Sequence, residues 1–344
     1  MDRSIIDIQK RILPDLLEIM QRRYDILRYI GLLEPVGRRS LSVSLGMTER
    51  VLRGEVDFLK EQNLIHVAKS GMSLTEDGKE ILSRLKGMMS EITGIGEMEE
   101  RLRNELSIEK AMIIPGDSDD TPWVKTEMGK ACANCMKKLL KGENIIAVTG
   151  GSTLAAVAEM ATPQIGDGLL FVPARGGFGE DVEHQANSIC SKMAEKTGSK
   201  HRVLYVPDEI SPEMYETFIK EQKINEVLQL IRSANMIIHG IGDALKMAER
   251  RKTSPEVMEF LKREKATGEA FGYYFDENGR IVHKLNTIGL QLEDLENAEY
   301  IIAVAGGSSK AKAIKSYMKQ APQKTILITD EGAAKLILQN NSNE

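Results

Sequence analysis

Hydrophobic positions in the first part of the chain recur with the period of amphipathic helices. The pattern predicts one helix over residues 12–33 and a short helix over residues 38–45, which Gly46 closes. Thr48 is a candidate N-cap for a further helix that reaches about Asn63. Two short helices joined by a glycine turn are the central unit of a helix-turn-helix, so this arrangement is expected here.

The last of these helices has an apolar face and a charged face, and a hairpin pattern follows it. Residues 64–75 alternate around Ser70-Gly71, which adds the wing of a winged helix. Arginines on the charged face can reach base edges or phosphates, while the preceding helix can contact the DNA backbone. The predicted DNA-binding residues are Arg38, Arg39, Ser40, Arg50 and Arg53. The alternative is that these arginines only solvate a helical surface.

A strongly helical stretch, interrupted at residues 93–96, joins this region to the rest of the chain. It is expected to connect two domains, and it either pairs protomers or is a plain solvated linker. The predicted organisation is a winged helix-turn-helix domain over 1–75, a helical linker over 76–108 and an effector-binding and oligomerisation domain over 109–344.

Beyond residue 108 the period changes, and short apolar runs alternate with amphipathic stretches. Runs of four or five residues that are apolar on both faces are typical of parallel strands covered by helices. The pattern therefore predicts an α/β fold with a doubly wound sheet in one body. The predicted strands are residues 111–114, 145–148, 169–172, 203–206, 236–239, 300–304 and 325–328.

Glycines follow four of these predicted strands, within residues 149–153, 175–177, 240–243 and 305–310. In a parallel sheet the four loops lie at the carboxyl edge, where ligands bind. Backbone N–H groups at glycine loops and helix N-termini bind anions, above all phosphate. A glycine after a strand is often only a tight turn. Four such loops, with Arg175, Lys310 and the pair Arg250-Arg251 nearby, favour a phosphorylated ligand.

Two of the glycine loops lie in segments that are similar to each other in sequence, here called the internal echo. Residues 145–153 match residues 301–309 at seven of nine positions. The echo reflects either duplication or convergence on one structural need. Both readings predict two similar anion-binding loops.

Composition and charge narrow the class of protein. The chain has 344 residues, of which 42% are hydrophobic and 28% charged, which excludes disorder, collagen and a disulfide-built mini-protein. Residues 1–70 hold 12 Lys and Arg against 10 Asp and Glu, whereas the net charge of the chain is −5. Only this mildly basic N-terminal segment is therefore expected to bind a polyanion. Three cysteines favour a reducing cytoplasm. No apolar stretch approaches a membrane span, and the first residues do not read as a secretory signal.

Several motifs of other functions are missing. The chain has neither the phosphate-binding loop of nucleotide hydrolases nor a Gly-x-Gly-x-x-Gly run after a strand, so nucleotide and dinucleotide readings are poor. Cys132 and Cys135 form a single pair inside a helix, expected as core or surface cysteines rather than a zinc site. Residues 117–120 are expected to form a helix-capping turn before Thr121-Pro122. No metal or cofactor site is predicted.

Six motifs together resemble the SorC family of bacterial sugar-responsive repressors, over essentially the whole chain. The resemblance implies a winged-helix domain and an effector domain similar to sugar-phosphate isomerases and glucosamine-6-phosphate deaminases. It also implies repression of a glycolytic operon, relieved when fructose 1,6-bisphosphate binds. The motifs are residues 37–41, 53–59, 149–153, 171–177, 239–242 and 305–310.

The resemblance also implies an effector site, residue by residue. A phosphate would lie against the backbone and side chains of Gly150, Gly151, Ser152, Thr153 and Arg175. Further anion contacts would come from Gln185, Arg250, Arg251 and Lys310, and Glu269 would accept hydrogen bonds from sugar hydroxyls. Ser152 stands where close relatives have Thr, which keeps the hydroxyl. The implied partners are operator DNA, the sugar phosphate and further copies of the chain, as a dimer or tetramer, without a membrane.

The rival hypothesis is an isomerase or deaminase that acts on a sugar phosphate. Such an enzyme needs a positioned carboxylate and a proton carrier. Asp243 and Glu269 are the candidates, but each also reads as a helix cap or a hydroxyl acceptor. The residues after Asp243 are Ala-Leu-Lys, without the Asp-Gly-His of the deaminases. A regulator is therefore preferred, and a bisphosphate and a monophosphate effector both remain open.

Overall fold

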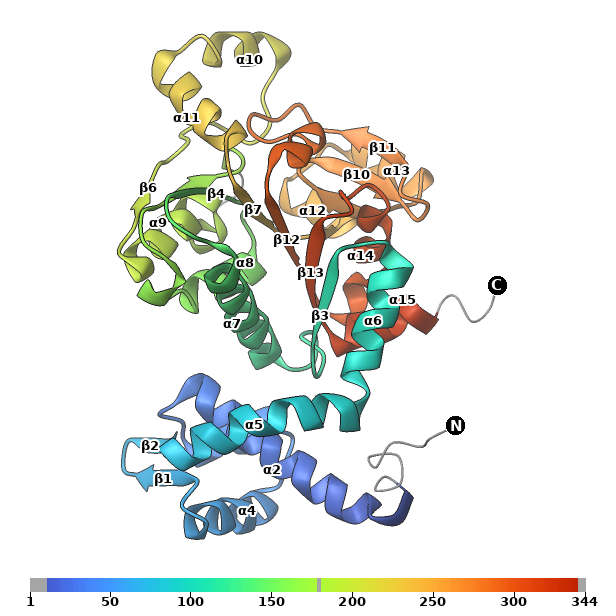
Figure 1. Ribbon diagram of the computed structural model, residues 1–344. Coiled ribbons are helices and arrows are strands. Elements are labelled where there is room, and N and C mark those ends of the chain that lie inside the picture. The colour runs from blue at the N-terminus through green and yellow to red at the C-terminus, as the bar shows by residue number, and fades with distance from the viewer. Residues whose placement is uncertain (1–10, 178–180, 340–344) are drawn as a thin grey trace. The chain divides into compact units, whose positions relative to one another are not determined.

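The computed structural model describes residues 11–177 and 181–339, and the chain divides into two compact units, Met1–Met98 and Glu99–Glu344 (Figure 1). The predicted fold class is confirmed: a small helical unit with a two-stranded hairpin precedes a larger α/β unit. The unit boundary falls inside the stretch that the sequence analysis treats as a linker.

The first unit contains the predicted helix-turn-helix. Thr48 caps its last helix as expected, because the threonine hydroxyl accepts a hydrogen bond from the backbone N–H of Val51. The apolar face of that helix is fully buried at Leu52, Val56 and Leu59. Its elements are α2 (Pro14–Leu33), α3 (Arg38–Ser44), α4 (Glu49–Glu61), β1 (Ile65–Ala68), β2 (Gly71–Leu74) and α5 (Glu76–Thr93).

The predicted wing is an antiparallel hairpin of β1 and β2, in the register Ile65↔Leu74 to Ala68↔Gly71. Val36 adds a bridge to it, since the backbone N–H and C=O groups of Val36 and Met72 bond each other reciprocally. The wing is thereby tied to the segment between α2 and α3.

The predicted interruption of the long helical stretch is confirmed at Gly94. This residue caps α5 in the left-handed conformation at φ +74°, which glycine adopts without steric cost. The next helix, α6 (Ile95–Leu106), spans the boundary between the two units.

The second unit is built on a seven-stranded parallel sheet in the order β3-β13-β12-β7-β4-β5-β6. From β4 the chain adds β5 and β6 on one side, and from β7 it adds β12 and β13 on the other, so the topological switch point lies between β4 and β7; the first strand, β3, pairs with β13 at the far edge. The strands are β3 (Lys110–Ile114), β4 (Asn144–Val148), β5 (Leu169–Pro173), β6 (Lys200–His201), β7 (Met236–His239), β12 (Tyr300–Val304) and β13 (Thr325–Asp330).

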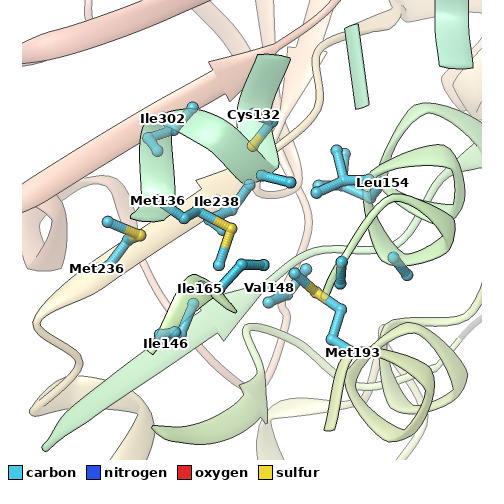
Figure 2. Close-up of a cluster of buried hydrophobic side chains, with 14 of the residues drawn as sticks. Cys132, Met136, Ile146, Val148, Leu154, Ile165, Met193, Met236, Ile238 and Ile302 are labelled. Atoms are coloured by element: carbon cyan, nitrogen blue, oxygen red, sulfur yellow. The ribbon is translucent and has the colours of Figure 1, made fainter. Parts of the chain in front are cut away.

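Helices α7 (Pro122–Leu139), α8 (Ser152–Glu159) and α9 (Ala186–Thr197) cover one face of this sheet (Figure 2). Alternate strand residues such as Ile146 and Val148 point into this core, and the residues between them are buried on the opposite face. Burial on both faces explains why the strands read as continuous apolar runs. The other helices are α10 (Pro212–Phe218), α11 (Gln222–Arg232), α12 (Ala244–Arg250), α13 (Pro255–Arg263), α14 (Ala311–Met318) and α15 (Glu331–Gln339).

The prediction of a strand at residues 203–206 was wrong. The edge strand is β6, two residues earlier in the chain, and it pairs with β5 over only two positions. Leu204 is buried but makes no ladder. Its backbone N–H and C=O instead bond the side-chain amide of Asn187, 3.0 and 3.1 Å away. A side chain from α9 thus satisfies the backbone groups that a strand would have paired.

A second, antiparallel sheet was not predicted. Its order is β11-β10-β9-β8, and its central hairpin turns at Phe271 and Gly272, both at positive φ. The turn lacks the Asn-Gly or Asp-Gly pair that marks such hairpins in a sequence. The strands are β8 (Gly242–Asp243), β9 (Ala266–Ala270), β10 (Tyr273–Asp276) and β11 (Ile281–Lys284).

Candidate functional site

The predicted DNA-binding side chains lie on α3 and α4. Arg50 and Arg53 are exposed on α4, opposite its buried face, and Arg39 is exposed on α3. Arg38 is half-buried. The exposed Ser40 has its hydroxyl 3.4 Å from the hydroxyl of Tyr29. Glu55, also on α4, pairs with Arg23 of α2 at 2.8 Å.

A cavity of about 320 Å³ lies at the carboxyl edge of the seven-stranded sheet, at the switch point between β4 and β7. Ligands of open α/β sheets bind at this place. Residues of all four glycine loops line it, as the sequence analysis predicted. The structure also brings together there every effector-site residue that the resemblance implies: Gly150, Gly151, Ser152, Thr153, Arg175, Gln185, Arg250, Arg251, Glu269 and Lys310.

The loop after β4 presents an open helix N-terminus to this cavity. Gly151 precedes α8 at φ +122°, and no side chain caps the helix. A Cβ at Gly150 would lie 2.7 Å from the carbonyl oxygen of His184, so only glycine fits. The same carbonyl accepts the N–H of Gly151 at 2.9 Å. The amides of Ser152 and Thr153, which begin α8, are left for an anion in the cavity.

The echoing loop after β12 is already filled by the protein's own carboxylates. Asp330 accepts the N–H of Gly307 at 2.6 Å, Asp117 that of Ser308 at 3.2 Å, and Asp119 that of Ser309 at 2.8 Å. The two loops are alike in sequence, but only the first is open to a ligand anion.

The acidic run at residues 117–120 therefore differs from its predicted role. Thr121, the residue before α7, makes no side-chain cap, and the carboxylates of Asp117 and Asp119 bond the distant loop after β12 instead. Burial opposes ionisation of Asp119, but hydrogen bonds from Ser309 and the charge of Lys310 outweigh it and lower its pKa. The run fastens one wall of the cavity.

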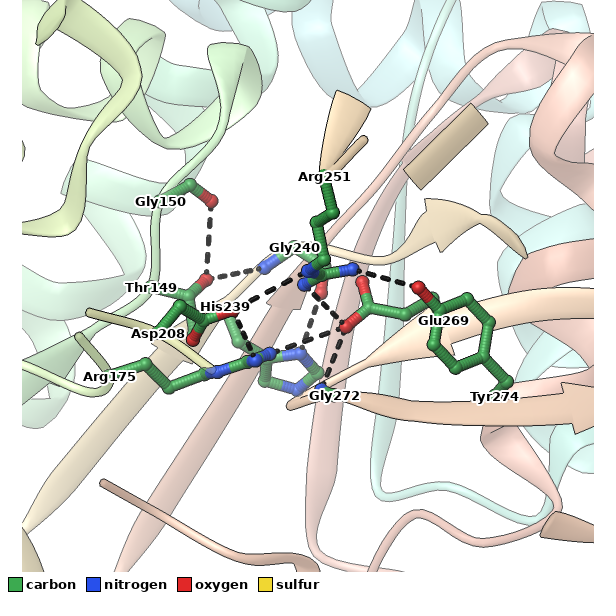
Figure 3. A network of polar contacts seen from close by, with 10 residues as sticks. All are labelled: Thr149, Gly150, Arg175, Asp208, His239, Gly240, Arg251, Glu269, Gly272 and Tyr274. Atoms are coloured by element: carbon green, nitrogen blue, oxygen red, sulfur yellow. Dashed lines mark hydrogen bonds and ion pairs between the residues drawn. The ribbon is translucent and has the colours of Figure 1, made fainter. Parts of the chain in front are cut away.

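A buried square of four charges forms the opposite wall (Figure 3). The Arg175 guanidinium donates to Asp208 at 2.7 Å and to Glu269 at 3.3 Å. Arg251 lies 3.4 Å from Asp208 and 3.0 Å from Glu269, and it also donates to the hydroxyl of Tyr274 at 3.2 Å. Each arginine is thus oriented by two carboxylates.

Glu269 keeps one oxygen for a ligand. Its Oε1 accepts hydrogen bonds from both arginines and from the N–H of Gly272 at 2.7 Å, while Oε2 accepts none from the residues described. Burial alone would raise the pKa of this carboxyl, but Arg251 and Arg175 outweigh burial and the pKa is lowered. Glu269 is therefore a carboxylate that can accept a hydroxyl, not a proton donor. Asp243 is a helix cap, since it accepts the N–H of Lys246 at 2.9 Å.

His239 is fully buried, next to the cavity-lining residue Gly240. Its Nδ1 lies 3.1 Å from the carbonyl of Gly240 and its Nε2 lies 3.2 Å from the hydroxyl of Tyr317, so we assign the proton to Nδ1. Burial lowers the pKa of His239 to about 4. The N–H of Gly240 donates to Thr149 at 3.1 Å, which ties the loops after β7 and β4 together (Figure 3).

Four polar residues that the sequence analysis missed also line the cavity: Lys125, His184, Asp208 and Lys246. Lys125 and Lys246 lie on helices, where a lysine reads as a surface residue. Asp208 lies in the irregular segment that follows residues 203–206, the stretch predicted as a strand. No sequence pattern marks these residues, because each reaches the cavity from a different element.

Two further findings concern the described part of the chain. None of its helices is long and apolar enough to cross a membrane. No group of three or more His, Cys, Asp or Glu residues in it could hold a metal ion. Cys132 and Cys135 are buried thiols of α7, in the sheet's main core.

Comparisons with known proteins cover both units. The family model CggR N-terminal DNA binding domain matches residues 19–89, and the sugar-binding domain model Sugar-bind matches residues 90–339. The central glycolytic genes regulators of Priestia megaterium and Bacillus subtilis are 55% and 54% identical, each over 98% of this chain and 99% of their own. A crystal structure of a SorC family regulator from Enterococcus faecalis covers 70% of this chain and 99% of its own, with 48% identity and a TM-score of 0.67.

A winged helix followed by an α/β unit with a cation-lined cavity is the architecture of a DNA-binding regulator with a sugar-binding domain. The relatives just described are named as transcriptional regulators, which supports the preference for a regulator over an enzyme. The chain belongs to the SorC family of transcriptional regulators, with a DNA-binding domain and a sugar-binding domain.

Proposed function

We propose that this protein represses a glycolytic operon and leaves its operator when a phosphorylated sugar, most favourably fructose 1,6-bisphosphate, binds the second unit. The open N-terminus of α8 supports this most directly, because it presents unbonded amides to a cavity that is rich in cations. The identity to two central glycolytic genes regulators over 98% of the chain supports the operon class.

The charges of the cavity favour two phosphate groups over one. Six lysines and arginines line it against four aspartates and glutamates. One phosphate would take the amides of Ser152 and Thr153 together with Lys310. The other would lie toward Arg250 and Gln185. A sugar ring between them would donate a hydroxyl to the second oxygen of Glu269.

Arg175 retains one donor for such a ligand. Its two terminal nitrogens are bound to Asp208 and Glu269, but its Nε is buried without a partner among the described residues. An unpaired buried N–H is costly, and a ligand oxygen would satisfy it. Arg175 is therefore proposed both to hold the carboxylates in place and to contact the ligand.

The assembly and the location follow from the same function. Helix-turn-helix heads usually read two spaced half-sites in pairs, so the working species is proposed to be a dimer or a tetramer. The cytoplasm holds both DNA and sugar phosphates, and it is the proposed location.

The test measures release of DNA by sugars. Fluorescence anisotropy of a duplex selected by the protein from a random library is followed while fructose 1,6-bisphosphate, fructose 6-phosphate or fructose is added. The bisphosphate should release DNA at the lowest concentration, and fructose should have no effect.

A substitution in the open loop sharpens this test. Gly150→Ala should weaken the bisphosphate effect by about tenfold or more, because the new methyl group meets the carbonyl of His184. Gly87→Ala, in open space on α5, is the matched control. DNA binding measured first without ligand checks the first unit of both variants, and an unchanged thermal unfolding midpoint checks that the second unit is folded. Release by fructose alone, or no release by any of the three sugars, would contradict the proposal.

A further inference from the structure

Three lysines from three separate elements line the cavity that the open N-terminus of α8 faces. Lys125 comes from the first turn of α7, Lys246 from α12 and Lys310 from the turn that precedes α14. The Nζ of Lys125 lies 3.4 Å from the hydroxyl of Ser152, the first residue of α8. Of the three, only Lys310 was predicted to contact the effector.

None of these three ammonium groups forms an ion pair with a residue that the structure describes. Lys310 is half-buried, and burial is the main cause that lowers its pKa. The charges of Lys125 and Lys246 lower it further, against an opposite effect of Asp119 and Asp330. The lysines therefore repel one another across the cavity.

The nearby carboxylates are already committed to backbone groups. Asp119 accepts the N–H of Ser309, and Asp330 accepts those of Gly307, Ser118 and Ala333. Asp243 accepts the backbone N–H of Lys246 rather than its ammonium group. The carboxylates therefore offset the charge of the three lysines only in part, and the helix amides beside them also favour an anion.

We propose that Lys125 and Lys246 are specificity-determining residues that tune this end of the cavity to a phosphoryl dianion. This inference rests on the proposed function, because it assigns the charge that the effector must have at α8. Lysines contact phosphate as point charges, so two or three of them favour a dianion over a carboxylate or a neutral sugar hydroxyl. The amides of α8 then orient the phosphoryl oxygens.

The placement of the two residues adds a structural consequence. Lys125 lies on α7, which packs on β12, β13 and β3 of the parallel sheet, whereas Lys246 lies on α12, which packs on β8 and β9 of the antiparallel sheet. A dianion bound between them would hold α7 and α12 to one anion.

The test is calorimetric titration of the full-length protein with fructose 1,6-bisphosphate, fructose 1-phosphate, fructose 6-phosphate and fructose. Lys125→Met and Lys246→Met should each lower the affinity for the bisphosphate by about tenfold, and the double variant should lower it by about a hundredfold. The loss should shrink as salt is raised, because salt screens the charges. Lys125→Arg should retain most of the affinity.

Lys138→Met, an exposed position near the end of α7, is the matched control and should bind like the unchanged protein. If the unchanged protein binds the bisphosphate and both methionine variants bind it equally well, the assignment of Lys125 and Lys246 is wrong and the proposed function stands. If the unchanged protein binds none of the phosphorylated probes, both proposals fail. Loss of affinity in Lys125→Arg equal to that in Lys125→Met would show a packing role instead of a charge role.

Discussion

At the scale of single residues, the protonation of buried ionisable groups near the cavity affects the stability of the second unit. His239 is the simplest of them, because it is neutral, fully buried and hydrogen-bonded through both ring nitrogens. Its imidazole packs against Phe271 at 4.8 Å and Tyr317 at 5.1 Å between ring centroids. Protonation would place an unpaired charge in this packing.

His239 should therefore make the second unit less stable in acid. The unfolded imidazole takes up a proton below its ordinary pKa of 6.5, but the native one does so only below about 4. The unfolded state thus binds more protons between these values, and the free energy of unfolding falls by about 2 kcal/mol between about pH 7.5 and about pH 5. His239→Gln should lose that part of the pH dependence.

Urea unfolding followed by fluorescence of Trp123 measures this effect, because the single tryptophan of the chain lies on α7. Protonation of carboxylates such as Glu269, whose pKa is lowered in the native state, also makes the protein less stable in acid. These carboxylates are present in both proteins, so their contribution cancels in the comparison. Equal pH dependence in His239→Gln and the unchanged protein would show that His239 does not titrate as inferred.

At the scale of elements, α4 is a helix with two faces and two roles. Leu52, Val56 and Leu59 anchor it in the first unit, and the Arg23–Glu55 ion pair fixes it to α2. Its opposite face can then be altered without loss of the fold.

Arg53→Ala should weaken operator binding while the first unit stays folded. A lost base contact should cost roughly 1–3 kcal/mol and relax the sequence preference, whereas a lost phosphate contact should reduce the salt slope by about one. Anisotropy titrations at two salt concentrations separate these cases. Lys86→Ala, exposed on α5, serves as the control. An operator affinity equal to that of the unchanged protein at both concentrations would refute this DNA-binding face.

At the scale of the whole molecule, effector and DNA must act on each other reciprocally. An effector changes DNA affinity only if it binds the DNA-competent and incompetent states unequally. Saturating operator DNA should therefore lower the affinity for fructose 1,6-bisphosphate by the same factor by which the sugar lowers the affinity for DNA. This factor is usually about 5–150. Titration of the sugar with and without operator, at one salt concentration, measures this factor. Identical sugar affinities on protein that is shown to be DNA-bound would exclude the bisphosphate as the inducer.

Local patterns in the sequence determined most of the elements. The spacing of Leu52, Val56 and Leu59, the cap at Thr48 and the alternation of residues 64–75 predicted the winged helix, since helix periods, caps and hairpins depend on neighbours in the chain. Apolar runs followed by glycines predicted the parallel sheet and its loops for the same reason. The likeness to a known family then indicated ten cavity residues, all of which line one cavity.

Only the tertiary structure decided which of the two echoing loops is open. Their sequences match at seven of nine positions, yet Asp117, Asp119 and Asp330 fill the loop after β12, and the N-terminus of α8 stays uncapped. The carboxylates come from segments far away in the chain, so no local pattern reports them. For the same reason Lys125 and Lys246 could not be predicted: a lysine on a helix has no period or motif of its own, and its partners are set by how the sheet brings distant helices to one edge.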